Sequence, residues 1–340
     1  MEHVAIDLGG RESQVCVRQA DGEILEEKRW RTADLGAYLK TRPPSRVIVE
    51  TCAEAFRVAD IAKELGHEAR VVPATLVRAL GVGERKTKTD KRDARKLSEM
   101  SCRMEVPSVH VASQLARELK TRLGMRQAHV AARTMFINTV RGWLRSQAIS
   151  IPKSADAFAQ RVAETMKDTV LPSHVLEQLK MVDVLSDSVH RLDKELAAMA
   201  KAHPICPRLM TVPGVGPVTA LAFVAVVDDV TRFKNAHELE AYLGLTPGES
   251  SSSNRVQRTS ITKAGNAMVR WCLVQGAWAA KRSHARRPLA MVEWSLEIEK
   301  RRGKRVAVIA LARKMAGILF ALWRDNTTYV AKLSARAATT

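Results

Sequence analysis

Short apolar runs separated by polar turns fill the first hundred residues of the chain. Asp21-Gly22 between two alternating runs predicts a hairpin turn, and Pro43-Pro44 and Gly66 predict the ends of helices. Five runs predict strands, at residues 3–8, 14–19, 23–30, 46–50 and 69–72. Two segments between them predict helices, at residues 32–41 and 54–65.

Three hairpin-linked strands followed by alternating helices and strands are typical of a ribonuclease-H-like or RuvC-like α/β domain. In that fold the first and fourth strands lie side by side. Asp7 ends the first apolar run and Glu50 ends the fourth. Open α/β sheets place their sites at the carboxyl ends of the strands, so we expect these two acids to face each other there.

A second pair of acids stands in the stretch 84–96, which holds seven basic and three acidic residues. Thr89 is a candidate cap for a helix that begins at Asp90, and Asp90 and Asp93 would then share one helix face. Taken alone, this pair is explained by the preference of acids for helix N-termini. Together with Asp7 and Glu50 it predicts a carboxylate site for hard divalent cations, of the kind used to cut phosphodiester bonds.

The rest of the chain is mostly helical in pattern. Helices are predicted at residues 110–147, 174–201, 218–227, 265–283, 288–301 and 304–323. The first two are long enough for an antiparallel stalk or a dimerising arm, although an ordinary helical core gives the same pattern. We therefore expect three parts: a RuvC-like domain at 1–108, a helical arm at 109–203 and a mostly helical C-terminal domain at 204–335.

Charge points to a polyanionic partner. The 340 residues carry a net charge of +19, and the pI is about 10.1. The longest apolar run, 218–227, is too short to span a bilayer, and no N-terminal targeting signal is visible. The five cysteines are scattered and include no Cys-x-x-Cys pair, so we expect a reduced, cytoplasmic setting without structural zinc or membrane.

Several segments are candidates for contact with nucleic acid. Pro213-Gly-Val-Gly216 before an apolar helix is typical of a helix-hairpin-helix motif, in which glycines let backbone N–H groups approach a phosphate, although a tight turn without a ligand is equally compatible. The candidate contacts are Lys86, Lys88, Lys91, Arg92, Arg95, Gly214, Gly216, Arg255, Arg258 and Lys263.

The serine run 250–253 is the oddest feature of the second half. On the residues alone, a flexible linker loop is the simpler interpretation. The alternative is a serine nucleophile acting on a phosphodiester, because Arg255 and Arg258 follow and arginines stabilise the charge that develops on phosphorus.

The ordered motifs of the chain resemble those of the DEDD transposases of bacterial insertion sequences, the group that works with a guide ("bridge" or "seek") RNA. The resemblance covers nearly the whole chain. It rests on Ile6-Asp7, Val49-Glu50-Thr51, Lys88-Thr-Asp-x-x-Asp-Ala-Arg95, Pro213-Gly-Val-Gly216, Gly244-Leu-Thr-Pro247, Glu249-Ser250-x-Ser-Ser and Lys263-Ala-Gly265.

This resemblance implies an RNA-guided transposase that cuts and rejoins DNA strands. Asp7, Glu50, Asp90 and Asp93 would bind Mg²⁺, and Ser250 would form a phosphoserine link to DNA, with Ser251 or Ser252 as the fallback. It also implies DNA and a structured guide RNA as partners. A homo-oligomer is implied too, with the tetrad of one subunit beside the serine of another.

Four other interpretations account for parts of the sequence. A junction resolvase or nuclease of the same fold would use metal and water without a covalent intermediate. An actin-like ATPase would use Asp7-Leu-Gly-Gly10 with Arg11 and Ser13 as a phosphate loop, but no second such loop follows residue 150. A tyrosine recombinase would use His284-x-x-Arg287 and Tyr329, which leaves the acids unexplained. A packaging protein would bind nucleic acid without catalysis.

Overall fold

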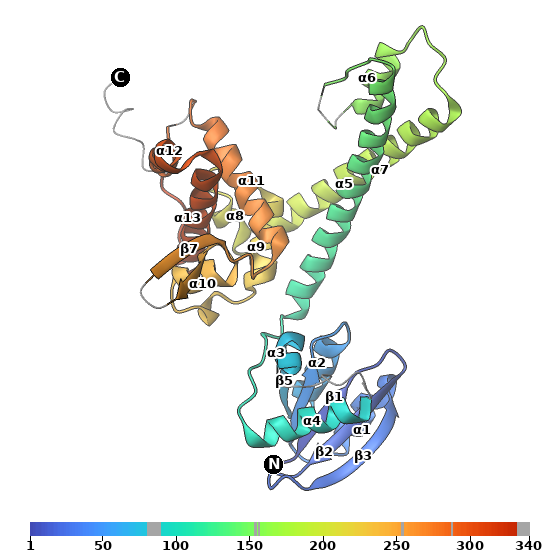
Figure 1. Cartoon of the computed structure of the whole chain (residues 1–340), viewed down its shortest axis with the longest axis vertical. Helices are drawn as coiled ribbons and strands as arrows, with labels where there is room; N and C mark the ends of the chain where they lie inside the picture. The colour runs from blue at the N-terminus through green and yellow to red at the C-terminus, as the bar shows by residue number, and fades with distance from the viewer. Residues whose placement is uncertain (80–89, 153–154, 156, 253–254, 287, 332–340) are drawn as a thin grey trace. The chain divides into compact units, whose positions relative to one another are not determined.

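The computed structural model describes residues 1–79, 90–152, 155, 157–252, 255–286 and 288–331, and at 78–79, 90, 250–252 and 255–258 it describes the backbone alone. The chain divides into two compact units, Met1–Ala112 and Ser113–Thr340, which are treated separately below (Figure 1). The predicted boundary after residue 108 falls close to this division.

Unit 1 is built on a five-stranded sheet in the order β3-β2-β1-β4-β5. The strands are β1 (His3–Asp7), β2 (Glu12–Arg18), β3 (Ile24–Arg31), β4 (Arg46–Glu50) and β5 (Glu68–Val72). β1 pairs antiparallel with β2 and parallel with β4. The predicted strands and the adjacency of the first and fourth are confirmed.

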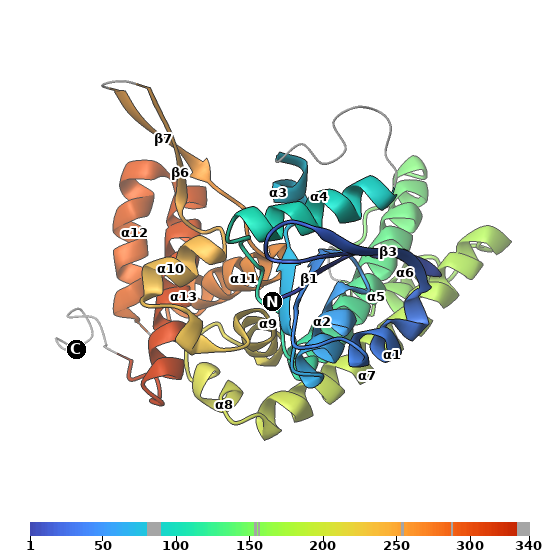
Figure 2. The same ribbon diagram turned by 90° about the horizontal axis from the view of Figure 1, so that it is seen from below.

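Helices cover both faces of this sheet (Figure 2). The short 3-10 helix η1 (Thr32–Asp34) leads into α1 (Leu35–Lys40), which shares one face with α2 (Ala55–Glu64), whereas α3 (Ala74–Ala79) and α4 (Asp90–Arg103) lie on the other. Along β1, Val4 and Ile6 pack toward α1 and α2, and Ala5 packs toward α4. Burial on both faces explains why Val4, Ala5 and Ile6 form an unbroken apolar run.

Unit 2 begins with an arm of three helices, α5 (Gln114–Ser146), α6 (Phe158–Thr165) and α7 (Ser173–Ala202) (Figure 1). The C-terminal part of α5 packs against the N-terminal part of α7, so the two long helices are antiparallel, which is one of the arrangements that the sequence left open. Arg126 and Asp193 form an ion pair between them, with 2.5 Å from Nε to Oδ1. We call the end that carries α6 the tip, because Phe158 and Val162 of α6 complete its core.

The rest of unit 2 packs around two apolar helices, α9 (Pro217–Val227) and α13 (Lys304–Arg324). Around them lie the four-residue helix α8 (Cys206–Leu209), the 3-10 helix η2 (Val230–Arg232), α10 (Ala236–Tyr242), the hairpin β6 (Pro247–Ser252) and β7 (Arg255–Ile261), α11 (Ala267–Ser283) and α12 (Ala290–Arg302). Within the described residues, α13 alone is long and apolar enough to cross a membrane by composition, and half of its apolar window is buried.

The base of the arm belongs to this same core. Leu119 and Leu123 of α5 and Leu196 of α7 pack with α9. Asp228, directly after α9, accepts hydrogen bonds from the backbone N–H of Ser113 at 2.9 Å and from its hydroxyl, and Ser113 caps α5. The predicted boundary after residue 203 therefore falls inside one compact unit.

Candidate active site

Asp7 and Glu50 stand at the carboxyl ends of adjacent parallel strands. Ile6 of β1 is level with Val49 of β4, so the two acids that follow lie at the same edge of the sheet, and both are half-buried. This is the arrangement that the apolar runs predict, and it is the position at which open α/β sheets bind their ligands.

Asp93 lies in α4 (Asp90–Arg103), which packs on β1, β2 and β4 (Figure 2). The side chain of Asp93 is buried, and Ala94 beside it has no exposed surface. A carboxylate buried on the sheet-facing side of a helix needs hydrogen bonds or cations around it. The side chain of Asp90, like Thr89, Lys86 and Lys88, lies outside what the structure describes.

The donor set suits a hard divalent cation, because carboxylate oxygens are the ligands that such ions prefer. Among the described side chains, which do not include that of Asp90, no three His, Cys, Asp or Glu lie close enough together to hold a metal ion. Asp7, Glu50 and Asp93 are therefore not gathered within metal-binding distance of one another in this structure, and the four-carboxylate site stays a prediction that rests on their positions in the fold.

Two of the predicted phosphate contacts are engaged with an acid in unit 1. Arg95 donates two hydrogen bonds to the Glu27 carboxylate of β3, and the Lys91 ammonium lies 3.4 Å from the same group. Only 14% of the Glu27 side chain is exposed. These contacts fix α4 to the sheet, which orients Asp93, while Arg92 is exposed on another face of the helix.

We expect unit 1 to lose stability on acidification partly through Glu27. Hydrogen bonding from Arg95 holds the pKa of this carboxyl below its ordinary 4.5. A carboxyl with a lowered folded-state pKa stabilises the fold above its unfolded pKa, and this contribution disappears as the pH falls through the folded value. Glu27→Gln should lower the free energy of unfolding by about 1 kcal/mol at neutral pH and remove this part of the acid sensitivity.

Urea unfolding at pH 7 and at an acidic pH below the lowered pKa of this carboxyl measures this. Glu23→Gln, on the exposed turn before β3, is the matched control. If the free energy of unfolding falls between the two pH values by the same amount in Glu27→Gln as in the wild type, the ion pairs with Glu27 do not contribute to the acid sensitivity.

The serine run was predicted to be a loop, and this is wrong for Ser250, Ser251 and Ser252, which belong to β6, while Ser253 lies outside the described residues. Ser250 is level with Gln257 of β7, and Ser252 with Arg255. Serine is not among the β-branched and aromatic residues that are enriched in strands, and the run shows no apolar alternation, so its sequence gives no strand signal. The side chains of these serines and of Arg255 and Arg258 lie outside the description.

Two of the recognised motifs form the base of this hairpin. The N–H of Lys263 donates to the carbonyl of Gly244 at 3.1 Å, and the N–H of Thr262 donates to the carbonyl of Thr246 at 2.9 Å. A Cβ atom on Gly244 would lie 2.6 Å from the N of Ala264, and one on Gly265 would lie 2.0 Å from the carbonyl O of Tyr242. Both glycines are therefore required by backbone packing, and Lys263 itself takes a positive φ of 57° in this junction.

The glycines of Pro213-Gly-Val-Gly216 differ from each other. Gly214 has a φ of +90°, and a Cβ atom there would lie 2.2 Å from the carbonyl O of Gly276 in α11. Gly216 caps α9 and has open space around it. Gly214 is thus required by packing, and only Gly216 is open to a ligand. The helix before the turn, α8, has four residues, so the motif is a shortened form of the one predicted.

Ser13, from the ATPase interpretation, and His284, from the tyrosine-recombinase interpretation, both have structural roles. Ser13 is buried and bonds to the Thr32 hydroxyl at 2.8 Å, which closes the turn after β1. The Nδ1 atom of His284 accepts a hydrogen bond from the N–H of Leu289 at 3.2 Å. These contacts account for Ser13 without a phosphate loop and for His284 without a recombinase site, while Arg287 lies outside the described residues.

Sequence comparison places these features in a family. Residues 4–148 match a family model for the DEDD transposases of the IS110 type. Residues 206–291 match a second model, described as "Transposase IS116/IS110/IS902 family". The chain is a transposase of the IS110/IS116 family. The two matches cover the sheet with its acids and the region around the serine hairpin.

Relatives are similar to this transposase over almost its full length. A probable family 20 transposase of Pseudomonas aeruginosa is 28% identical over 97% of this chain and 98% of its own length. The transposase for insertion sequence element IS1111A of Coxiella burnetii is 27% identical over 96% of this chain and 90% of its own. The transposase for IS1328 of Yersinia enterocolitica is 25% identical over 96% and 98%.

Membership of this family establishes a DNA transposase, an enzyme that cuts and rejoins DNA, and implies a divalent metal ion. The α/β sheet followed by a mostly helical second part is consistent with a DEDD, RuvC-like domain and its C-terminal partner.

Proposed function

We propose that this transposase cuts DNA by attack of a serine on a phosphodiester, assisted by a carboxylate site that holds Mg²⁺. The observation that carries the proposal is the placement of Asp7 and Glu50 at adjacent strand ends, with the buried Asp93 on the helix packed over them. Asp90, one turn before Asp93, is proposed as the fourth ligand. The ion would supply Lewis-acid stabilisation of charge on the reacting phosphate.

In the proposed step, the oxygen of Ser250 bonds to phosphorus and the bond from phosphorus to the 3′-oxygen breaks. The proton lost by the serine ends on the released 3′-hydroxyl, and the 5′-phosphate remains on the protein as a phosphoserine. Attack by the 3′-hydroxyl of another strand then reverses the exchange. Each step breaks one phosphodiester and forms one, so rejoining needs no external energy source. Arg255 is level with Ser252 across the hairpin and Arg258 is level with Glu249, and both are proposed to stabilise charge on phosphorus.

The tetrad and the serine belong to different compact units. Catalysis therefore requires unit 1 and unit 2 to meet over one phosphate, within a chain or between subunits. We propose the second arrangement, a homo-oligomer with composite sites. A metal-and-water nuclease of the same fold is the competing function, since it needs only unit 1.

A denaturing gel tests the serine chemistry. Protein purified with its native RNA is mixed with Mg²⁺ and DNA that carries the ends of the element. A protein–DNA band that survives denaturation and is removed by protease is the expected result. Cleavage without any such band would establish the metal-and-water alternative.

We also propose that a structured guide RNA selects the DNA site, with the protein contacting mainly backbone. The supporting observation is the charge of +19 on a chain without an evident helix for reading the major groove. We expect protein freed of RNA to lose specific cleavage and to regain it when the RNA is restored. Cleavage at correct sites by RNA-free protein would contradict guidance while leaving the serine chemistry intact.

A further inference from the structure

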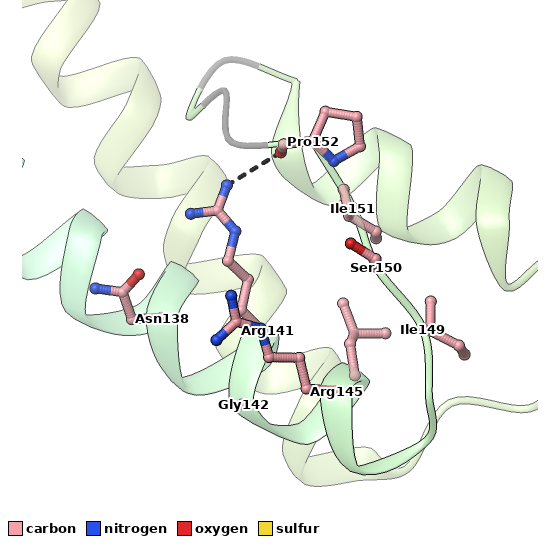
Figure 3. Close-up of a pocket in the computed structure, with 9 residues that line it drawn as sticks. Asn138, Arg141, Gly142, Arg145, Ile149, Ser150, Ile151 and Pro152 are labelled. Carbon is pink, nitrogen blue, oxygen red and sulfur yellow. Dashed lines mark hydrogen bonds between the residues drawn. The ribbon is translucent and has the colours of Figure 1, made fainter.

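The tip of the arm contains a hollow lined by arginines (Figure 3). Its volume is about 660 Å³, which lies within the roughly 300–1,000 Å³ of ordinary ligand pockets. Asn138, Arg141 and Arg145 line it from α5, and the segment 149–152 lines it from the opposite side. The three α5 residues fall three and four positions apart, so they share one face of the helix.

The hollow arises from the way α5 ends. Ala148 takes a φ of +58°, and its N–H donates to the carbonyl of Arg145 at 3.0 Å. The N–H of Ile149 donates to the carbonyl of Leu144 at 2.9 Å. This pair of bonds is the Schellman ending of a helix, and it turns the chain back so that residues 149–152 run beside the last turns of α5.

Arg141 is held in place at the wall of this hollow. Its Nη2 donates to the carbonyl of Pro152 at 3.1 Å, and its guanidinium lies 5.1 Å from the ring centre of Phe158 (Figure 3). Its Nε is buried and has no acceptor among the described residues. A guanidinium fixed by packing loses little freedom when it binds an anion, which favours binding.

Arg145 lies one turn further along and has a different environment. It is exposed, and no ion pair or side-chain hydrogen bond joins it to a described residue. The lining residues of the hollow include no Asp or Glu. Two arginines four positions apart on a helix repel each other unless an anion lies between them. The helix dipole favours Arg145 at this C-terminus, but it does not account for Arg141 or for the hollow.

We propose that this hollow binds a phosphate of a nucleic-acid backbone. Arg141 and Arg145 would supply the charged N–H donors, and the Asn138 amide one further donor. The apolar side chains of Leu144, Ile149 and Ile151, on the remaining wall, suit a sugar rather than a small free ion. Transposases act on DNA, so a polynucleotide is the available source of phosphate. The proposal is independent of the serine, the tetrad and the guide RNA proposed above.

Binding measured over a range of salt concentrations tests this site in the full-length protein, with EDTA present so that no strand is cut. The probes are a duplex DNA, a duplex RNA and a single-stranded RNA of equal length. Arg145→Gln should weaken binding of at least one probe about fivefold. The slope of log K against log salt should fall in magnitude by roughly 0.7–0.9, the value for one phosphate contact. The probe that loses affinity identifies the source of the phosphate.

Two further variants make the result specific. Arg191→Gln removes an equal charge from an exposed position of α7. It should change neither the affinity for the probes nor the slope of log K against log salt. Arg145→Lys keeps the positive charge, so the slope of log K against log salt should stay at the wild-type value. If Arg145→Gln and Arg191→Gln behave alike on all three probes, the site does not exist. Unchanged binding with an altered oligomeric state in sedimentation would show instead that this surface meets a second copy of the chain. The serine chemistry is read separately, from the covalent protein–DNA adduct, so its failure is distinguishable from failure of this site.

Discussion

Ser250→Ala is expected to abolish the covalent protein–DNA adduct and to lower strand transfer by at least about a thousandfold, because removal of a nucleophile disables the whole catalytic group. The replaced oxygen is the atom that would bond to phosphorus, and no neighbouring water can conserve the phosphodiester in its place. The measurement is the denaturing-gel assay with Mg²⁺ and element-end DNA, performed on equal amounts of wild-type and variant protein.

Ser251→Ala and Ser252→Ala are the matched controls, since they remove the same group from adjacent positions of β6. Both should keep the adduct. An adduct that is lost in Ser251→Ala and kept in Ser250→Ala would move the nucleophile by one residue. Because the hairpin base of Gly244 and Gly265 is untouched in all three variants, a difference among them cannot arise from loss of the hairpin.

The carboxylate half of the site is tested on the same gel. Asp7→Asn keeps the shape of the side chain but removes its charge, and we expect both adduct and cleavage to fall by at least about a hundredfold, as for loss of a metal-site group. Glu12→Gln, an exposed acid at the start of β2, is the charge-matched control. Cleavage that survives Ser250→Ala but not Asp7→Asn would identify a metal-and-water nuclease.

The central strands β1 and β4 of unit 1 were predictable because they are buried on both faces. Val4, Ala5 and Ile6 pack against helices on opposite sides, so the apolar run is continuous and ends abruptly at the polar residue of the site. The positions of Asp7 and Glu50 follow from the same signal, since the end of an apolar strand is the edge of the sheet.

Other elements gave too little local signal. The helices α6, α8 and α10 have eight, four and seven residues, too few for an apolar period to emerge. For α10 a sequence signal existed and was missed: Asn235 accepts from the N–H of Glu238, and the Glu238 carboxylate accepts from the N–H of Lys234, which is a capping arrangement. The pairing of Glu27 with Arg95 joins residues 68 positions apart, and nothing in either local sequence predicts it.

Gly214→Ala is expected to destabilise unit 2 by about 2–5 kcal/mol. Its new Cβ atom would lie 2.2 Å from the carbonyl O of Gly276, so α9 and α11 must separate, and overpacking of this kind costs about 1–3 kcal/mol. The φ of +90° adds about 1–2 kcal/mol, because alanine rarely adopts that conformation. Chemical unfolding followed by tryptophan fluorescence measures the loss, since Trp278 and Trp323 pack against this core.

Gly216→Ala is the matched control, two residues away in the same turn. Its φ is −100° and no atom lies within 4 Å of the added Cβ, so its stability should change by less than about 1 kcal/mol, the cost of a poorer cap. If Gly214→Ala is as stable as the wild type, the close approach to Gly276 is not present in solution.

The same pair of variants decides what the glycine turn does. If the N–H groups at the start of α9 contact a DNA phosphate, the added methyl group at position 216 blocks that approach, and DNA binding falls although the fold is intact. Unchanged binding by Gly216→Ala would mean that the turn only joins α8 to α9, and that Gly214 is glycine solely because α11 passes so close. Measuring unfolding and binding on both variants separates the packing role from the phosphate role.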